Sequence, residues 1–178
     1  MAKKSLYLRI AGTLATLGPL GGRLPAPGTW GALAGTVFYW LAFQTTGLNS
    51  PGHLRQFLML AGALTLFAVP VCSAGEKFLG RKDPGEVNFD EFAVMPFCYA
   101  GLGPVISRAG TAGQILWLLA GFALFRLFDI AKPFGIKKLQ KIPGGAGIVI
   151  DDFVAALFTC ACLWLARWAY VLTANLSN

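Results

Sequence analysis

The chain has 178 residues, of which 56% are hydrophobic and 13% are charged. Soluble domains carry about 25% charged residues, so this composition excludes an ordinary soluble protein and predicts a membrane protein. The net charge is +7. Because the basic residues flank apolar runs, we interpret that charge as favouring anionic lipid headgroups over nucleic acid as partners. The length suits a single domain, residues 1–178.

The chain begins with a basic arm, residues 1–23, which we expect to lie on the membrane as an amphipathic helix. A membrane-spanning helix needs about 20 apolar residues, so an apolar run of about 15 residues, 92–106, is open to partial insertion or a kink. The expected fold is all-α: a polytopic membrane helical bundle of four to five membrane helices plus the N-terminal arm. Its apolar runs cover residues 29–48, 54–74, 92–106, 112–128 and 153–174.

All eight acidic residues lie between residues 76 and 152. Four of them fall within one segment, 81–91, and three within another, 129–152. Carboxylates beside long apolar runs are costly unless they are paired, reach water or bind a cation. Mg²⁺ prefers oxygen ligands, and no histidine or usable thiolate accompanies these acids. We therefore predict one catalytic metal site, with Mg²⁺ as cofactor, built from Asp83, Asp90, Glu91, Asp129, Asp151 and Asp152.

Two acidic doublets, Asp90–Glu91 and Asp151–Asp152, directly precede apolar runs. Acids at that position also favour a helix N-terminus, where free backbone N–H groups and the helix dipole accommodate negative charge. Capping is therefore the alternative interpretation of each doublet taken alone. Capping needs only one acid per helix, however, and clustered carboxylates repel each other unless a cation neutralises them.

The basic residues test how the runs cross the membrane. If the N-terminus is cytoplasmic and all five runs cross, the outer loops hold only Arg55 and Arg108, and Arg126 and Arg167 lie inside runs. The other eleven of the fifteen Lys and Arg residues are then cytoplasmic, as the positive-inside tendency requires. The same layout places both acidic segments on the cytoplasmic face. If the 92–106 run did not cross, they would lie on opposite sides.

A second distinctive stretch, 125–133, places Arg126, Asp129 and Lys132 at a spacing of three, on one face of a helix. The three form either an ion-pair ladder or a site in which Asp129 binds metal and a cation binds phosphate, since cations stabilise a transferring phosphoryl group. Glycines near residues 28 and 144 let a backbone approach either a phosphate or a neighbouring helix closely. The candidate phosphate-binding residues are Arg126, Lys132, Lys82, Thr29, Gly144 and Gly145.

At these residues the chain resembles the phosphatidylglycerophosphatase A family of bacterial membrane lipid phosphatases. Two positions depart from the family pattern: Asn88 stands where an aliphatic residue is usual, and Val94 where glycine is usual. Neither departure removes a carboxylate. The matching pieces follow in family order across residues 25–160: PGTWG at 27–31, KDPGE at 82–86 with Asp90–Glu91, FRLFD at 125–129 with Lys132–Pro133, and Gly144–Gly145 with Gly147–Ile148 and Asp151–Asp152.

The resemblance implies an all-α fold and Mg²⁺-dependent hydrolysis of phosphatidylglycerophosphate, an anionic phospholipid, to phosphatidylglycerol and inorganic phosphate in glycerophospholipid biosynthesis. It also implies a multi-pass protein of the bacterial cytoplasmic (inner) membrane with its active site facing the cytoplasm. Two other interpretations stay open. A cation carrier would need acids inside the apolar runs, whereas these lie at run ends, and a non-catalytic assembly factor would use them only as caps. The oligomeric state is undetermined.

Overall fold

The computed structural model describes residues 5–133 and 142–176, with side chains described up to residue 172. Within those residues every regular element is helical, which confirms the expected all-α fold. The α-helices are α1 (Leu6–Ala15), α2 (Pro19–Arg23), α3 (Pro27–Tyr39), α4 (Leu54–Leu79), α5 (Phe89–Cys98), α6 (Gly103–Arg108), α7 (Gly110–Ala131) and α8 (Gly145–Leu176). A π-helical turn, η1 (Trp40–Gln44), extends α3, and a 3₁₀ turn, η2 (Pro51–His53), precedes α4.

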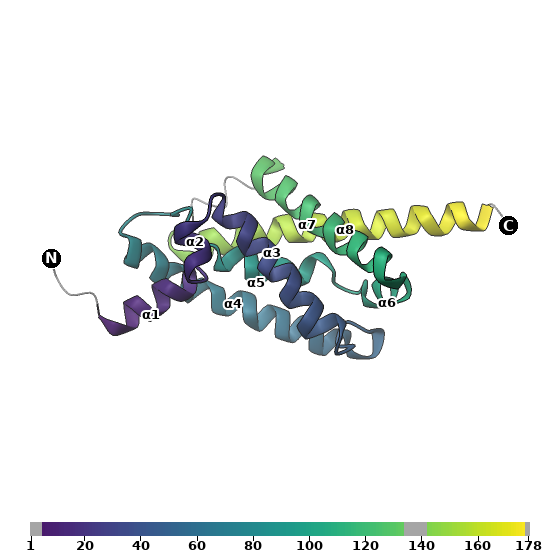
Figure 1. Cartoon of the computed structure of the whole chain (residues 1–178), viewed down its shortest axis with the longest axis horizontal. Coiled ribbons are helices and arrows are strands. Elements are labelled where there is room, and N and C mark those ends of the chain that lie inside the picture. Colours follow the sequence, from purple (N-terminus) through teal and green to yellow (C-terminus); the bar gives the residue numbers. More distant parts are fainter. Residues whose placement is uncertain (1–4, 134–141, 177–178) are drawn as a thin grey trace.

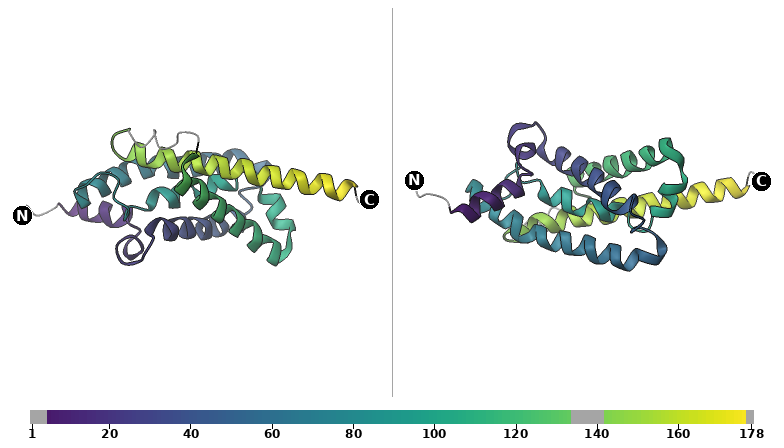
Figure 2. Two further views of the ribbon diagram at one scale, coloured as in Figure 1. Left: turned by 90° about the horizontal axis from the view of Figure 1, so that it is seen from above. Right: turned by 60° about the horizontal axis from the view of Figure 1, so that its bottom comes forward.

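The long helices run lengthwise through the molecule and enclose the short helix α5 (Figures 1 and 2). Helix α5 packs against α3, α4 and α8. Nine of its ten residues are buried, Phe92 being the exception. A helix that is apolar all round is expected in such a central position. The enclosed helix carries two of the candidate site residues, Asp90 and Glu91, at its first turn.

Three helices of the described chain are long and apolar enough to cross a membrane, spanning Pro51–Leu79, Gly110–Ala131 and Gly145–Leu172. That number is smaller than the four to five membrane helices expected from the sequence. The apolar run 29–48 forms the 13-residue helix α3 and then the π-helical turn η1. The run 92–106 is divided between α5 and α6.

The break between α5 and α6 has a specific cause in a distant side chain. Asn49 donates from Nδ2 to the carbonyl oxygen of Tyr99 (2.7 Å) and accepts at Oδ1 from the backbone N–H of Gly101 (3.0 Å). These two bonds replace helical partners, and Gly101 adopts a left-handed φ of 73° that glycine tolerates well. The chain therefore makes its third pass through the bundle as a broken helix.

Both acidic segments nevertheless lie at the same end of the bundle. Helix α6 sits at the opposite end, because Gln44 at the end of η1 donates to the carbonyl oxygen of Gly103 (3.0 Å). Helix α7 then returns to the end where α5 begins (Figure 1). The third pass crosses the bundle without being one long helix, and the two acidic segments therefore meet at one end, as the sequence predicted.

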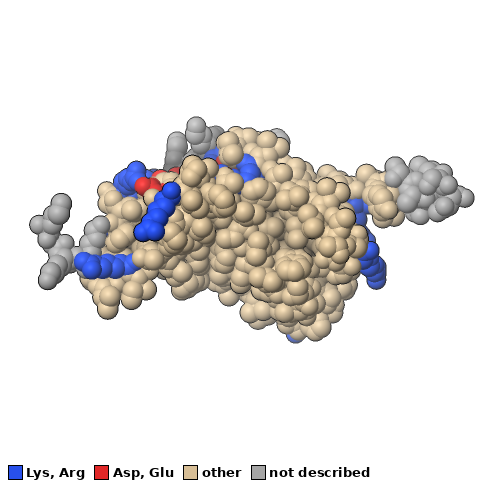
Figure 3. Space-filling view, in the orientation of Figure 1, with Lys and Arg blue, Asp and Glu red and all other residues tan. Residues whose placement is uncertain are grey.

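The N-terminal arm contains an amphipathic helix, α1, packed against the last turns of α4. Gly12 lies so close to Phe78 that a Cβ atom there would be 2.3 Å from its ring. The opposite face exposes Leu6, Tyr7 and Ile10, as an interfacial helix would. Figure 3 shows basic groups beside acidic atoms near this end, and a broad uncharged surface across the middle of the molecule. Residues 1–4 lie outside the described residues.

Candidate active site

The first turn of α5 is held in place by the residue before it, Asn88. Its backbone N–H donates to the carbonyl oxygen of Ala15 (2.9 Å), and its side-chain Nδ2 donates to that of Pro27 (3.1 Å). On α3, Gly31 allows this approach, because a Cβ atom there would lie 2.5 Å from the backbone oxygen of Asn88. These contacts fix the start of α5 against both α1 and α3.

Three buried carboxylates meet at this point: Asp90 and Glu91 from α5 and Asp152 from α8. One oxygen from each lies within 4.8 Å of the others, and the residues are 5%, 9% and 4% exposed. We call these three residues the acidic triad. Among the residues that the structure describes, they form the one group of three or more metal-ligating side chains at this spacing. They come from segments that the sequence analysis expected to converge.

The acidic triad is electrostatically unbalanced. Asp90 Oδ1 and Glu91 Oε2 are buried without a hydrogen-bond partner. Burial raises the pKa of the Asp90 carboxyl to about 6. Burial, followed by the nearby charge of Asp90, also raises the pKa of Glu91 well above its usual value. Such groups are stable as anions only when a cation neutralises them.

The ligand chemistry of the acidic triad fits Mg²⁺. All three side chains offer hard carboxylate oxygens, which Mg²⁺ prefers, and two of those oxygens have no protein partner. Clustered buried carboxylates of this kind are a donor set that soft metals do not favour. The residues present are therefore suited to the ion that the sequence analysis expected.

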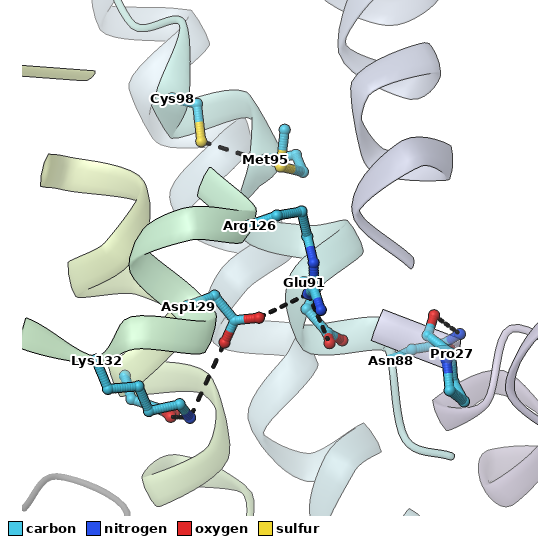
Figure 4. Close-up of polar contacts among 9 residues, drawn as sticks. Pro27, Asn88, Glu91, Met95, Cys98, Arg126, Asp129 and Lys132 are labelled. Atoms are coloured by element: carbon cyan, nitrogen blue, oxygen red, sulfur yellow. Dashed lines mark hydrogen bonds and ion pairs between the residues drawn. The ribbon is translucent and has the colours of Figure 1, made fainter. Parts of the chain in front are cut away.

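The other two acids of the cluster are paired with cations (Figure 4). Asp129 Oδ2 accepts a hydrogen bond from Arg126 Nη1 (2.6 Å), and Asp129 Oδ1 lies 3.9 Å from Lys132 Nζ. Lys132 Nζ also donates to Asp151 Oδ2 on α8. We call Arg126–Asp129 and Lys132–Asp151 the outer ion pairs. The ladder that the spacing of three predicted is present and continues onto a second helix.

The outer ion pairs touch the acidic triad through Arg126, whose Nη1 lies 3.6 Å from Glu91 Oε1. The backbone of Gly28 on α3 packs directly against Glu91, because a Cβ atom on Gly28 would lie 2.1 Å from Glu91 Oε1. Lys132 caps α7 in a left-handed conformation, with φ 42°. Burial alone would lower the pKa of Lys132, but its hydrogen bond to Asp151 and the surrounding carboxylates raise it. Lys132 therefore carries its charge.

The remaining expected residues lie at the edge of the site. Asp83 is exposed in the loop between α4 and α5, and its backbone N–H donates to Glu76 Oε1 (2.9 Å). It is outside the acidic triad. Lys82 is exposed and lines a shallow groove of about 460 Å³ together with Gly144. Thr29 is half-buried in the first turn of α3.

Gly145 has a packing role in the structure. Its backbone N–H donates to Ser73 Oγ (2.8 Å), and a Cβ atom on Gly145 would lie 2.1 Å from the carbonyl oxygen of Val69. This is the helix-packing alternative left open from the sequence. The amide of Gly145 is already used, and its contact with α4 sets the position of α8 and hence of Asp152.

Sequence reasoning missed the residues that fix the site from outside it. Asn88 stood out only as a departure from a family pattern, yet it ties α5 to two other helices. Its preference for the position preceding a helix was a usable signal. Ser73, near the end of the apolar run 54–74, gave no sign of its bond to Gly145.

Comparison with known proteins shows that most of the chain matches one protein family. A family model described as "Phosphatidylglycerophosphatase A" matches residues 13–167. "Phosphatidylglycerophosphatase A" of Haemophilus influenzae is 36% identical over 135 residues, covering 75% of this chain and 74% of the relative. The protein of that name from Escherichia coli K12 is 32% identical over 139 residues, covering 78% and 72%.

A third relative carries a different name. A Bacteroides thetaiotaomicron protein, provisionally named a phosphatidylinositol-3-phosphatase, is 30% identical over 143 residues, covering 80% of this chain and 84% of the relative. No solved structure gave a significant match.

Proposed function

The chain belongs to the phosphatidylglycerophosphatase A family, and from that premise we propose that it is a Mg²⁺-dependent lipid phosphatase. Its reaction is hydrolysis of the terminal phosphate monoester of phosphatidylglycerophosphate, which gives phosphatidylglycerol and inorganic phosphate. Water adds to phosphorus, the bond between phosphorus and the glycerol oxygen breaks, and the glycerol oxygen takes up a proton. The role is a step in glycerophospholipid biosynthesis.

One observation carries this proposal more than any other: the buried acidic triad, with two carboxylate oxygens that have no hydrogen-bond partner, stands beside two cations that are themselves held by acids. Asp90, Glu91 and Asp152 would hold the metal ion, since their oxygens converge and two of them lack protein partners. A Mg²⁺ ion bound there would supply Lewis-acid polarisation of the phosphate and make a nearby water molecule more acidic.

The outer ion pairs supply the second half of a phosphate site. The side chains of Arg126 and Lys132 are 17% and 20% exposed, so an incoming phosphate can reach both. Asp129 and Asp151 hold these cations in fixed positions, which stabilises the negative charge that a transferring phosphoryl group develops. One carboxylate of the site accepts the proton of the attacking water. This division gives five of the six expected acids two roles, in place of the single ligand shell expected from sequence, and leaves Asp83 outside both.

The position of the site at one end of the bundle suits a lipid substrate. In the described part of the chain, three helices are long and apolar enough to cross a membrane, so a phospholipid can keep its acyl chains in the bilayer while its headgroup reaches the acids. Among the described residues, Lys77, Arg81, Lys82 and Lys132 lie at this end, which supports a cytoplasmic active site in the bacterial inner membrane.

A phosphate-release assay on the purified full chain tests the proposal. Phosphatidylglycerophosphate in mixed micelles should release phosphate, EDTA should abolish the release, and excess Mg²⁺ should restore it. Phosphatidylinositol 3-phosphate belongs in the same assay because of the Bacteroides relative's name. A chain that hydrolyses neither lipid in Mg²⁺ would contradict the proposal and leave the cation carrier and the non-catalytic assembly factor. Ion flux through vesicles containing the chain would separate those two.

A further inference from the structure

A second cavity lies away from the acids, between α4 and α8, with α5 beneath it. Its volume is about 340 Å³, within the range of about 300–1,000 Å³ that is usual for small-ligand sites. Residues of α4 between 62 and 69, Phe97 of α5 and residues of α8 between 146 and 153 line it. Thr65 has the one polar side chain in this lining, and its hydroxyl already donates to the carbonyl oxygen of Ala93 (3.3 Å). The cavity therefore offers a ligand only apolar contacts.

The opening results from a glycine on α4. Helices α4 and α8 touch backbone to backbone where Gly145 meets Val69. About two turns earlier on α4, Gly62 has no side chain, and no atom beyond its own stretch of helix backbone lies within 4 Å of where its Cβ would be. The rings of Phe97 and Phe153 pack edge to face, 4.9 Å apart, and close the bottom. The result is a lined groove between two helices.

The groove lies at the depth of the acidic triad. On α8, its lining residue Phe153 is next to Asp152, and Val149 and Ile150 lie within one helical turn of it. On α5, Phe97 is about two helical turns beyond Asp90. Helices α4 and α8 are two of the three helices in the described part of the chain that are long and apolar enough to cross a membrane; in that arrangement the groove would open to the hydrocarbon region. Triad and groove thus share α8 as a common wall.

We propose that this groove binds one fatty acyl chain of the lipid whose phosphate enters the acidic triad. The inference rests on the proposed function. It adds a binding site for the acyl part of the substrate, which the acidic triad does not contact. A lipid whose headgroup is fixed by the triad must run its chains into the bilayer from that depth, and the groove begins there. Its lining is apolar and its one hydroxyl is occupied, which matches an acyl chain and no polar ligand.

The test fills the groove and compares long-chain with short-chain substrates. Gly62→Trp adds a large side chain where no neighbouring atom stands in the way, and replacing a helical glycine does not weaken the helix. For dioleoyl phosphatidylglycerophosphate in mixed micelles, we expect the KM of this variant to rise about tenfold. For the water-soluble dihexanoyl substrate, whose chains are too short to fill the groove, kcat and KM should stay close to wild type.

The matched control is Leu116→Trp, which places the same side chain on a membrane-exposed position of α7 outside the groove; it should leave both substrates unaffected. Unchanged kinetics of Gly62→Trp with the dioleoyl substrate would overturn the inference while leaving the proposed function intact. An equal loss with both substrates would also overturn it, because the effect would not then depend on the chain.

A labelling experiment tests the groove without requiring turnover. A dioleoyl-type phosphatidic acid with a diazirine in one acyl chain, photolysed in micelles with the wild-type chain, should label residues 62–69 or 146–153 more strongly than residues 113–120 of α7. Excess unlabelled phosphatidylglycerophosphate should reduce the labelling of the groove. Uniform labelling that the excess lipid does not change would contradict acyl-chain binding there, even if the chain proves to be a phosphatase.

Discussion

The bundle contains two buried polar clusters, one at each end, and they differ in whether their polar side chains have hydrogen-bond partners. The acidic triad and its outer ion pairs occupy one end. The other end holds four neutral polar residues, which we call the amide cluster: Tyr39, Gln44, Asn49 and Tyr99. The amide cluster joins η1 to the break between α5 and α6.

The side chains of the amide cluster are fully used. Asn49 Nδ2 donates to Tyr39 Oη (2.7 Å), which donates in turn to Gln44 Oε1 (3.0 Å). Gln44 Nε2 donates to Ser107 Oγ (2.6 Å), and Tyr99 Oη donates to the carbonyl oxygen of Leu118 (2.7 Å). A network satisfied in this way rigidifies a core.

At the acidic end, by contrast, several buried polar atoms lack hydrogen-bond partners. Among the described residues, the buried side-chain atoms without a hydrogen-bond partner all belong to that end: Asn88 Oδ1, Asp90 Oδ1, Glu91 Oε2, Arg126 Nε and Asp151 Oδ1. Each such atom costs about 1–3 kcal/mol. Polar groups satisfied at one end and five atoms left unsatisfied at the other are what the proposed function requires, with the second set available to a ligand. Under the proposed function, the amide cluster is structural and the acidic end is functional.

The largest effect on activity is expected when one member of the acidic triad is neutralised, which tests whether the acidic end is the functional one. Asp90→Asn or Asp152→Asn should lower phosphate release by about 10²–10³-fold, because a carboxylate that would hold the charge-stabilising metal ion is lost. Folding should be retained, since the change removes mutual repulsion among buried carboxylates. Phosphate release and the Tm in detergent measure the two effects. A variant that keeps most of its activity would remove that residue from the proposed site.

Metal binding provides a readout that does not depend on turnover. Mg²⁺ at a hundredfold excess over its Kd should stabilise the wild-type chain by about 2.7 kcal/mol, because it binds only the folded state. The Tm should therefore rise with Mg²⁺ in wild type and stay flat in Asp90→Asn. An equal rise in both proteins would place the ion elsewhere.

The outer ion pairs should give a smaller effect of a different kind. Asp129→Asn leaves the acidic triad intact but frees Arg126, so turnover should fall about 10–100-fold, as for residues that orient a site indirectly. The Mg²⁺-dependent rise in Tm should remain. Glu86→Gln is the matched control, because Glu86 pairs with Arg81 on the surface, where ion pairs contribute little. Loss of the Mg²⁺ effect in Asp129→Asn would return Asp129 to the metal ligands.

The sequence was sufficient to predict which acids lie close together. It did not predict that some form the acidic triad and others the outer ion pairs. The tandem acids directly before apolar runs indicated Asp90, Glu91 and Asp152 as site residues. The spacing of three indicated an ion-pair ladder from Arg126 to Lys132. The pairing of Lys132 with Asp151 was not visible, because it depends on a left-handed backbone at the end of α7.

The break in the third pass was hidden for a similar reason. Residues 92–106 are apolar enough for one helix, and the side chain that interrupts them, Asn49, lies 50 residues earlier in a loop. Local sequence pattern reports the propensity of a segment, whereas this interruption is a tertiary hydrogen bond that overrides it. For the same reason, the enclosure of α5 by α3, α4 and α8 could not be read from its own ten residues.

The smallest effect on activity is expected at the amide cluster, where the effect on stability should be clear. Asn49→Leu removes both bonds that hold the break open and leaves the carbonyl oxygen of Tyr99 and the N–H of Gly101 without their partner. The free energy of unfolding should fall by about 3 kcal/mol, measured by denaturation in detergent. The kcat of the molecules that remain folded should match wild type, because the acids at the other end are untouched. If turnover instead fell while stability was unchanged, the two ends would be coupled, and the division between a structural and a functional cluster would fail.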